Sequence, residues 1–430
     1  MSAAEALSRT TLLMRTVLRA DAPAQELLEA LLGTEVALIA DANNVRSTEG
    51  QTALIAAAGL ITRSGAQCYL EAPNVPLKGT AAPLRGTHLA EALLDFGTDL
   101  IPGRRLVPGI PPREIDLAVV IGDSSWSGEA RQVLSMSGNG WTGRIGISGE
   151  RWAPGGSPLG ALASAGLAAG EAYKAAMRRV RGWASGPTTF DAFFAASESA
   201  EVALAPPGTP LPTPTLGAFD IVSGGAIAQA VLYTLSRIPG AFGEARVIEA
   251  QATDLTNINR YAFLRRSRVG ELKANHLASL DLERITVTAV PVRYEESTLG
   301  QIGQLAPHVL VGVDHVPSRW AVQRARPQWL GIGATGDYLA SVTHHAPGLP
   351  CALCLHPDGS NGPAEIPTAA FVSHWAGLWL ASMFLRTVSG DRIGPDEQQV
   401  YMATLRPDSI SSIWRSRGVA VEGCPLRCPL

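Results

Sequence analysis

The stretch Phe219–Lys273, FDIVSGGAIAQAVLYTLSRIPGAFGEARVIEAQATDLTNINRYAFLRRSRVGELK, decides the fold of this chain. It begins with a short β-prone run, passes through the small residues Ser223–Ala226, and continues into Ile227–Ile238, whose apolar spacing predicts a helix. Residues Arg246–Glu249 predict a second parallel strand that ends on an acid. This order of strand, small turn, helix and strand predicts the first half of a Rossmann-like α/β unit.

The small-residue turn is a candidate phosphate-binding site, because a helix that starts directly after a strand points N–H groups and the positive end of its dipole at an anion. The candidate nucleotide-binding residues there are Ser223, Gly224, Gly225 and Ala226. Glu249, about 25 residues further on, is a candidate for binding a ribose hydroxyl, with Gln251 beside it. The turn lacks the usual three glycines, so a strand, turn and helix without a ligand is an equally good interpretation of this segment alone.

Downstream of the turn, several motifs follow in a fixed order. They are Asn257-x-x-Arg260, Val269-Gly-x-x-Lys273, Asp314-x-x-x-x-Arg319, and the cysteine pairs Cys351/Cys354 and Cys424/Cys428. With this set, residues from about 216 to 430 resemble the ThiF-type adenylyltransferases, the family of ubiquitin-activating enzymes and of the activators of sulfur-carrier proteins. The glycine loop of that family corresponds to residues 223–228 and its ribose-binding acid to Glu249.

The resemblance implies ATP-dependent adenylation of a carboxylate, with Mg²⁺ as cofactor. Attack on the α-phosphorus of ATP builds negative charge on the phosphate oxygens, and the resemblance assigns Arg260 and Lys273 to neutralise it. It also implies that Asp314 holds Mg²⁺, a hard cation that prefers oxygen ligands, and that Asn257 hydrogen-bonds a phosphate or a metal-bound water. Residues 265–268 contain further arginines, so a solvated basic face is the alternative.

Cysteine spacing predicts a structural zinc site. Of the five cysteines, four lie in the two close pairs, which suit tetrahedral Zn²⁺ with no position left for water. A disulfide framework would leave Cys68 over, and we recognise no signal sequence, so we expect a reducing cytoplasm. With four thiols available, zinc needs no histidine, and we expect His344, His345 and His356 to be structural.

The nucleophile that would accept an activated acyl group is open. Family members that form a thioester use a cysteine on the loop after the first zinc pair, whereas residues 358–368 here contain none. Cys68 lies on a predicted strand, where a small buried side chain is the simpler interpretation. Either the reaction stops at the acyl-adenylate, or a hydroxyl such as that of Ser360 or Thr368 accepts the acyl group.

The first half of the chain predicts a second α/β unit. Strands are expected at residues 36–40, 67–70, 116–121 and 143–148, and helices at residues 50–64 and 158–177. This unit has no glycine turn, no Asn-x-x-Arg motif and no cysteine pair. We therefore expect residues 1–205 to be an inactive adenylation-like domain, residues 206–215 a proline-rich linker, and residues 216–430 the active domain, the two α/β domains forming a pseudo-dimer.

In the resembled family, an arginine from an N-terminal helix of the inactive or partner unit reaches the triphosphate. The predicted helix Ser8–Arg19 offers Arg9, Arg15 and Arg19, and we favour Arg15. An ordinary surface arginine is the alternative for each of them.

Composition limits the partners. The net charge is −3 and the pI is about 6.3, so no general electrostatic footprint for nucleic acid is present. No apolar run reaches the roughly 20 residues of a membrane span, so we expect no membrane insertion. The content of alanine, glycine and arginine suits a bacterial source.

Two function classes follow from the sequence. In the first, the chain adenylates the C-terminal glycine of a ubiquitin-like protein and passes it towards a conjugating enzyme, for which the paired halves offer a docking surface. In the second, it adenylates a sulfur-carrier protein, a peptide or a small carboxylate without an acyl-enzyme intermediate, which the missing loop cysteine favours. A scaffold without activity is a third class, which the retained polar motifs disfavour.

Overall fold

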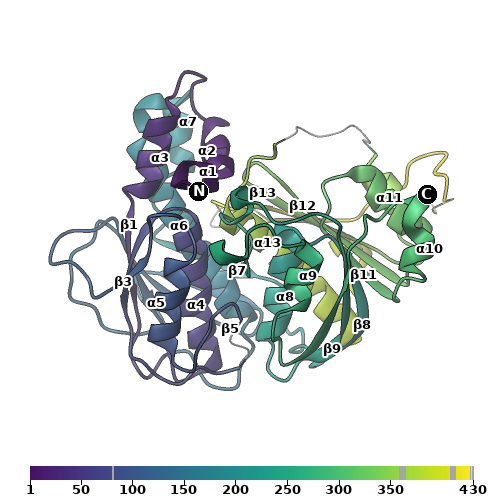
Figure 1. The fold of residues 1–430 in the computed structure, drawn as a ribbon, viewed down its shortest axis with the longest axis horizontal. Coiled ribbons are helices and arrows are strands. Elements are labelled where there is room, and N and C mark those ends of the chain that lie inside the picture. Colours follow the sequence, from purple (N-terminus) through teal and green to yellow (C-terminus); the bar gives the residue numbers. More distant parts are fainter. Residues whose placement is uncertain (80–81, 358–364, 407–412, 427, 429–430) are drawn as a thin grey trace.

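The computed structural model describes residues 1–79, 82–357, 365–406, 413–426 and 428. Within these residues the strands form two sheets, one of seven strands from the first half and one of eight from the second. Figure 1 shows the halves side by side, with the helix α13 (Ala370–Val388) at their junction. The expected mixed α/β class is confirmed, with a sheet rich in parallel strands in each half.

The first sheet has the strand order β3-β2-β1-β4-β5-β6-β7. Its strands are β1 Glu35–Ile39, β2 Gln67–Glu71, β3 Leu106–Pro108, β4 Leu117–Ile121, β5 Val133–Asn139, β6 Thr142–Gly146 and β7 Ser199–Ala203. Its helices are α1 Ala3–Ala6, α2 Ser8–Arg15, α3 Ala24–Leu32, α4 Thr48–Arg63, α5 Leu89–Thr98, α6 Leu159–Arg179 and α7 Pro187–Phe193. The first five strands in spatial order pair in parallel, and β6 and β7 are antiparallel.

The second sheet has the order β10-β9-β8-β11-β12-β13-β14-β15. Its strands are β8 Thr215–Val222, β9 Phe242–Ile248, β10 Arg284–Val290, β11 His308–Val311, β12 Trp329–Gly336, β13 Leu339–His345, β14 Gln399–Ala403 and β15 Ile413–Ser416. Its other helices are α8 Ala226–Arg237, α9 Lys273–Ala278, α10 Leu299–Ile302, α11 Val316–Arg324 and α12 Ala352–Leu355. Apart from the added β15, its order and strand directions repeat those of the first sheet.

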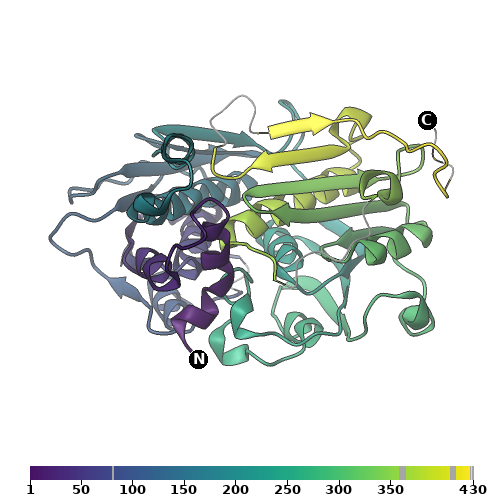
Figure 2. The same cartoon turned by 90° about the horizontal axis from the view of Figure 1, so that it is seen from above.

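Helices from both halves pack together where the sheets meet. A Cβ on Gly377 of α13 would lie 2.4 Å from the Cβ of Ala230 in α8, and a Cβ on Gly166 of α6 would lie 2.8 Å from the ring of Trp375. These glycines let the helix backbones approach closely, so one continuous apolar cluster runs through both halves. Figure 2 shows the N-terminal helices, in purple, at the same junction. Residues 204–214, which join β7 to β8, contain no helix or strand.

Among the described helices, none has the length and apolarity that crossing a membrane requires.

A buried histidine at this junction makes stability depend on pH. His374 of α13 is buried, its Nε2 lies 2.9 Å from the carbonyl oxygen of Leu162 in α6, and the loss of hydration lowers its pKa to about 4. The unfolded chain, with a histidine pKa near 6.5, therefore binds a proton between about pH 6.5 and 4 that the folded state does not. Stability must then fall as pH falls through this window.

We expect acidification from pH 7 to pH 5 to cost about 2 kcal/mol at this residue. The variant His374→Gln keeps a donor for Leu162 but cannot titrate, so its free energy of unfolding should fall less steeply below pH 6.5. Urea unfolding at several pH values measures both slopes. Above pH 7 the two curves should run parallel, and equal slopes at all pH values would contradict the buried neutral imidazole.

Candidate functional site

The small-residue turn between β8 and α8 is closed by the protein's own side chains. Ser223 has a φ of 141°, a conformation that few side-chain-bearing residues adopt. The Gly225 N–H donates to Ser223 Oγ at 2.9 Å, and the Gly224 N–H donates to Glu249 Oε2 at 3.1 Å. Two of the N–H groups expected to face an anion are thus used internally, while a Cβ on Gly224 would lie 2.7 Å from the Cβ of Lys273.

Glu249 connects this turn to Lys273. Its Oε1 accepts from the Gln251 N–H at 2.9 Å, and Gln251 Oε1 in turn accepts from Lys273 Nζ at 2.7 Å. The backbone N–H of Lys273 also donates to the carbonyl of Gln251. The acid predicted to bind ribose and the lysine predicted to bind phosphate therefore lie in one hydrogen-bonded row at the end of β9.

Tyr261 is a site residue that the sequence did not single out. The guanidinium carbon of Arg260 lies 5.5 Å from the centre of its ring and Lys273 Nζ lies 5.8 Å from it. The negative face of an aromatic ring attracts cations, so the Tyr261 ring makes cation–π contacts with both of these predicted catalytic cations. Arg260 also donates to the Thr256 carbonyl and to Asn259 Oδ1, the latter at 2.8 Å. The signal in the sequence that could have indicated Tyr261 is its position directly after Arg260 of the Asn257-x-x-Arg260 motif.

Asp314 follows β11, which pairs with β8 so that Val311 lies beside Val222. Since β9 continues the sheet on the other side of β8, this is a point where the strand order reverses, and such points form crevices in α/β proteins. The side chain of Asp314 is open to solvent on one side, and crowding on the others raises its pKa by loss of hydration. Four cations oppose this rise: Arg319, Arg260, Lys273 and Arg9.

Arg9, on α2 of the first half, joins this cluster where the sequence favoured Arg15. Its Nε and Nη1 are buried without a hydrogen-bond partner in the described structure, and its Nη2 lies 3.8 Å from Glu365 Oε1. Arg15 lies at the end of the same helix and is exposed. Arg19 stacks on Trp183 and lies 3.8 Å from Asp21. The cationic group of the second half is thus completed by Arg9 from the first.

Asn257 and Thr368 have local partners. Asn257 Oδ1 accepts from the Asp254 N–H at 2.9 Å and caps a short helical turn, so this amide positions the loop that carries Arg260. Thr368 lies beside the site, since its N–H donates to the carbonyl of Arg9. Its hydroxyl is buried and 3.2 Å from Ser373 Oγ. Ser360 lies outside the described residues.

Arg63 of α4 holds this loop from the first half. Its guanidinium is buried and donates to the carbonyls of Ile258 at 2.7 Å, Ala262 at 3.0 Å and Leu264 at 2.8 Å. Burial lowers the pKa of Arg63 to about 9. The loop that presents Arg260 and Tyr261 therefore takes its backbone partners from the other half of the molecule.

We predict that Arg63→Met lowers the free energy of unfolding by about 3 kcal/mol, because it leaves buried carbonyls without donors. The matched control is Arg113→Met, which removes an exposed arginine paired with Glu35 and should change the unfolding midpoint far less. Chemical denaturation of both variants measures the difference. Similar losses in the two variants would contradict a special role for Arg63.

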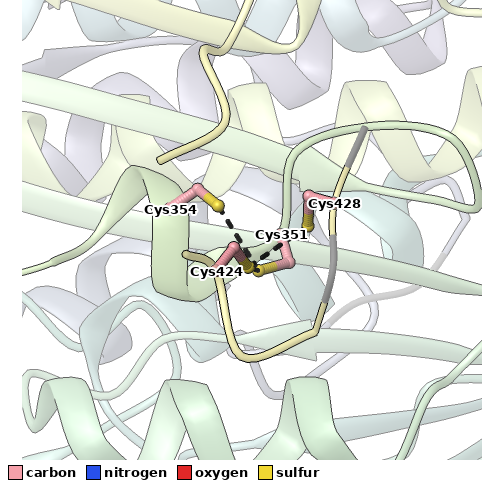
Figure 3. A group of neighbouring side chains, drawn as sticks. All are labelled: Cys351, Cys354, Cys424 and Cys428. Atoms are coloured by element: carbon pink, nitrogen blue, oxygen red, sulfur yellow. Dashed lines mark hydrogen bonds between the residues drawn. The ribbon is translucent and has the colours of Figure 1, made fainter. Parts of the chain in front are cut away.

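The four predicted cysteine ligands lie together (Figure 3). Cys351 precedes α12, Cys354 lies in it, and Cys424 and Cys428 come from the C-terminal segment; all four sulfurs lie within 4.8 Å of one another. The nearest sulfur pairs are 3.5–3.8 Å apart, close to the roughly 3.8 Å edge of a tetrahedron with Zn–S bonds of about 2.3 Å. The Val421 N–H points at Cys354 Sγ at 3.5 Å, as for a thiolate ligand. These residues can hold a metal ion, and four thiolates fit zinc.

The remaining cysteine and the histidines have other surroundings. Cys68 on β2 is buried, which raises its pKa to about 12 and suits an inert thiol. His345 and His356 are hydrogen-bonded, as expected of structural histidines. His344 differs, because both of its ring nitrogens are buried without a partner among the described residues.

We predict that the purified chain carries about one zinc ion and that verified removal by a chelator lowers its melting temperature, because metal binding is folding free energy. Cys354→Ser should lose the metal, whereas Cys68→Ala should retain it. Metal analysis and thermal unfolding measure these outcomes. An unchanged melting curve after complete metal loss would contradict a structural site.

Comparisons with known proteins match parts of the chain. The family model described as "BilD N-terminal domain" matches residues 35–186. A curated relative, "Uncharacterized protein y4jF" of Sinorhizobium fredii (strain NBRC 101917 / NGR234), is 29% identical over 153 residues, which span 34% of this chain and only 29% of the relative.

Solved structures of E. coli MccB are similar at a lower level. The complex with succinimide has a TM-score of 0.40 and 17% identity, covering 48% of this chain and 66% of MccB. The complex with SeMet MccA has a TM-score of 0.41 and 15% identity, covering 69% and 98%. The complex with ATP has a TM-score of 0.41 and 14% identity, covering 68% and 97%.

Proposed function

We propose that this chain is an ATP-dependent adenylyltransferase that activates the C-terminal carboxylate of a protein or peptide. The observation that carries the proposal is the gathering of Arg9, Arg260, Lys273 and Arg319 near Asp314, with Asp254 and Glu365 as further acids beside Arg260 and Arg9. Like charges at close range destabilise a folded protein unless an anion balances them. A triphosphate supplies such an anion, and the crevice at the ends of β8 and β11 is where α/β sheets bind nucleotides.

In this proposal the chain's own residues divide the work. Glu249 binds the ribose, since each of its oxygens accepts one backbone N–H and keeps a free acceptor position. Arg9, Arg260 and Lys273 neutralise the phosphates. Asp314 holds Mg²⁺, which would add positive charge on the phosphate oxygens when bound.

The reaction is a substitution at phosphorus. An oxygen of the substrate carboxylate attacks the α-phosphorus, the bond to the bridging oxygen of the leaving group breaks, and acyl-adenylate and pyrophosphate result. The fixed cations stabilise the charge that moves onto the pyrophosphate. Because Tyr261 and Gln251 hold Arg260 and Lys273 in place beforehand, little reorganisation accompanies the step.

We further propose that the first half is an inactive copy of the second. Its strand order is the same, but Asn44 fills the corresponding crevice. The fully buried Asn44 amide donates to Asp41, Asp123 and Ser124 at 2.8–3.1 Å, and its oxygen accepts from the Trp152 N–H at 3.2 Å. Because this buried amide and its partners occupy the ends of β1 and β4, this half would serve to hold the loop and supply Arg9 rather than to bind a nucleotide.

Thr368 and Ser360 are the two hydroxyls considered as acceptors of the acyl group. The Thr368 hydroxyl is buried against Ser373, which disfavours it as the acceptor. Ser360 lies outside the described residues, and we propose release or direct transfer of the acyl-adenylate. Peptides, sulfur-carrier proteins and ubiquitin-like proteins all present a suitable C-terminal carboxylate. A ubiquitin-like protein passed on to a conjugating enzyme in the cytoplasm is the narrower version of the proposal.

Exchange of labelled pyrophosphate into ATP tests the activity, with ubiquitin-like proteins and peptides ending in glycine as substrates. Substrate-dependent exchange is expected, lost in Arg260→Ala and Asp314→Ala. Arg9→Gln should lower exchange about 100-fold, because it removes one preorganised charge, whereas Arg15→Gln from the same helix should stay within about twofold.

Equal activities of Arg9→Gln and Arg15→Gln would contradict the assigned role of Arg9. Exchange above a few per cent in both Arg260→Ala and Asp314→Ala, each verified as folded, would contradict adenylation at this site. The absence of exchange with every carboxylate offered would turn the proposal towards a scaffold.

A further inference from the structure

A row of buried and half-buried polar side chains lies between Asp314 and the cysteine cluster. Arg319 Nη1 lies 3.3 Å from His356 Nδ1, and His356 Nε2 lies 3.0 Å from Thr343 Oγ1. Thr343 Oγ1 lies 3.0 Å from His345 Nε2, and His345 Nδ1 lies 2.9 Å from the carbonyl oxygen of Pro350. We call this row the Arg319–Pro350 chain. It begins at a cation beside Asp314 and ends at the residue before Cys351.

The hydrogen positions in the chain can be derived from its far end. The Pro350 carbonyl can only accept, so His345 carries its proton on Nδ1 and leaves Nε2 as an acceptor. Thr343 must then donate its hydroxyl proton to His345 and accept from His356 Nε2–H. His356 Nδ1 is left as an acceptor.

The Arg319 end of the chain independently gives the same proton positions. A guanidinium can only donate, so Arg319 requires an acceptor at His356 Nδ1. Both ends thus demand neutral histidines of opposite tautomers, protonated on Nε2 at His356 and on Nδ1 at His345. The buried surroundings of His345 agree with this, since loss of hydration lowers its pKa to about 4.

The ends of the chain are fixed to the two sites. At one end, Arg319 Nε donates at 3.0 Å to the carbonyl of Val313, the residue before Asp314. At the other end, the Pro350 carbonyl also accepts from Gln398 Nε2 at 2.7 Å. Residues 351–356, which carry Cys351 and Cys354, form the segment that we call the cysteine turn. The helix α11, which carries Arg319, makes two further contacts with it: Trp320 Nε1 donates to the His356 carbonyl at 2.8 Å, and Gln323 Oε1 accepts from the Ala352 N–H at 3.0 Å.

We infer that Arg319 is a positioning residue for Asp314 and that the Arg319–Pro350 chain makes its position depend on the folded cysteine turn. Arg319 heads the cations that lower the pKa of Asp314, and its direction is set by Val313 and His356. The cysteine cluster therefore does more than fasten the C-terminus, because it also fixes the charge environment of Asp314. Of the effects expected from breaking this chain, only the change in the rate of pyrophosphate exchange rests on the proposed function.

The test breaks the chain at its middle. Thr343→Val removes the shared hydroxyl without touching Asp314, Arg319 or a cysteine. The matched control is Thr404→Val, which removes another buried hydroxyl that donates to the Tyr338 carbonyl at 2.7 Å. The Thr404 N–H still satisfies that carbonyl. Both variants should bind metal as the wild type does, and thermal unfolding verifies that both fold.

The first readout is NMR of imidazole ¹⁵N, assigned with His345→Gln and His356→Gln. The wild type should show the Nδ1–H form at His345 and the Nε2–H form at His356, and Thr343→Val alone should lose this pattern. The carboxyl ¹³C titration of Asp314 is the second readout. Its pKa should rise in Thr343→Val, because Arg319 is held less firmly, and stay unchanged in Thr404→Val. The same tautomer at both histidines, or equal Asp314 titrations in the two variants, would overturn the inference.

Pyrophosphate exchange is the third readout. Thr343→Val should lower it about fivefold to tenfold, as loss of one buried hydrogen bond predicts, while Thr404→Val should stay within about twofold. Equal exchange in the two variants would overturn the coupling to Asp314. If the wild type shows no exchange, the proposed function fails. The histidine tautomers and the Asp314 titration still test whether the Arg319–Pro350 chain positions Arg319.

Discussion

The buried guanidinium of Arg63 is the contact on which the arrangement of this molecule depends. It extends from α4 of the first half and supplies hydrogen-bond donors to the backbone of residues 258–264 in the second. A buried carbonyl without a donor costs about 1–3 kcal/mol, so the loop that presents Arg260 keeps this conformation only with the first half in place. Arg265 makes the reciprocal contact, since it donates to the Pro83 carbonyl and to Asp95 of the first half. The halves therefore form one cooperative structure.

Four cations gather near Asp314 in the region that this contact organises. Three of them are held by hydrogen bonds: Arg260 by Thr256 and Asn259, Lys273 by Gln251, and Arg319 by Val313 and His356. Arg9 alone among them keeps buried nitrogens without hydrogen-bond partners in the described structure. Holding like charges together costs free energy unless an anion joins them. These cations lie where the parallel strands β8 and β11 end, which is where we propose that a phosphate-bearing ligand binds.

The repeated sheet topology shows how one fold gives two outcomes. In the first half Asn44 lies beyond the ends of β1 and β4, where its amide hydrogen-bonds Asp41, Asp123, Ser124 and Trp152. In the second half Asp314 and a small-residue turn follow the corresponding strands β11 and β8. There the C-terminal segment returns to place Cys424 and Cys428 beside Cys351 and Cys354. In this half α11 also contacts the segment that carries Cys351 and Cys354, through Trp320 and Gln323.

The sequence by itself determined several of the helices and strands, the repetition of an α/β unit, and the four cysteines that lie together. Apolar periodicity, turn residues and ligand spacing act over a few residues and can be read locally. It also named Glu249, Arg260, Lys273 and Asp314, which the fold brings into one crevice. Only the tertiary structure decided that Arg9 lies near Asp314 while Arg15 is exposed, that Arg63 holds the loop, and that the N–H groups of Gly224 and Gly225 are occupied. Those outcomes depend on contacts between residues far apart in the chain, such as Arg63 and Ile258, and no local pattern specifies which side chain will meet which backbone.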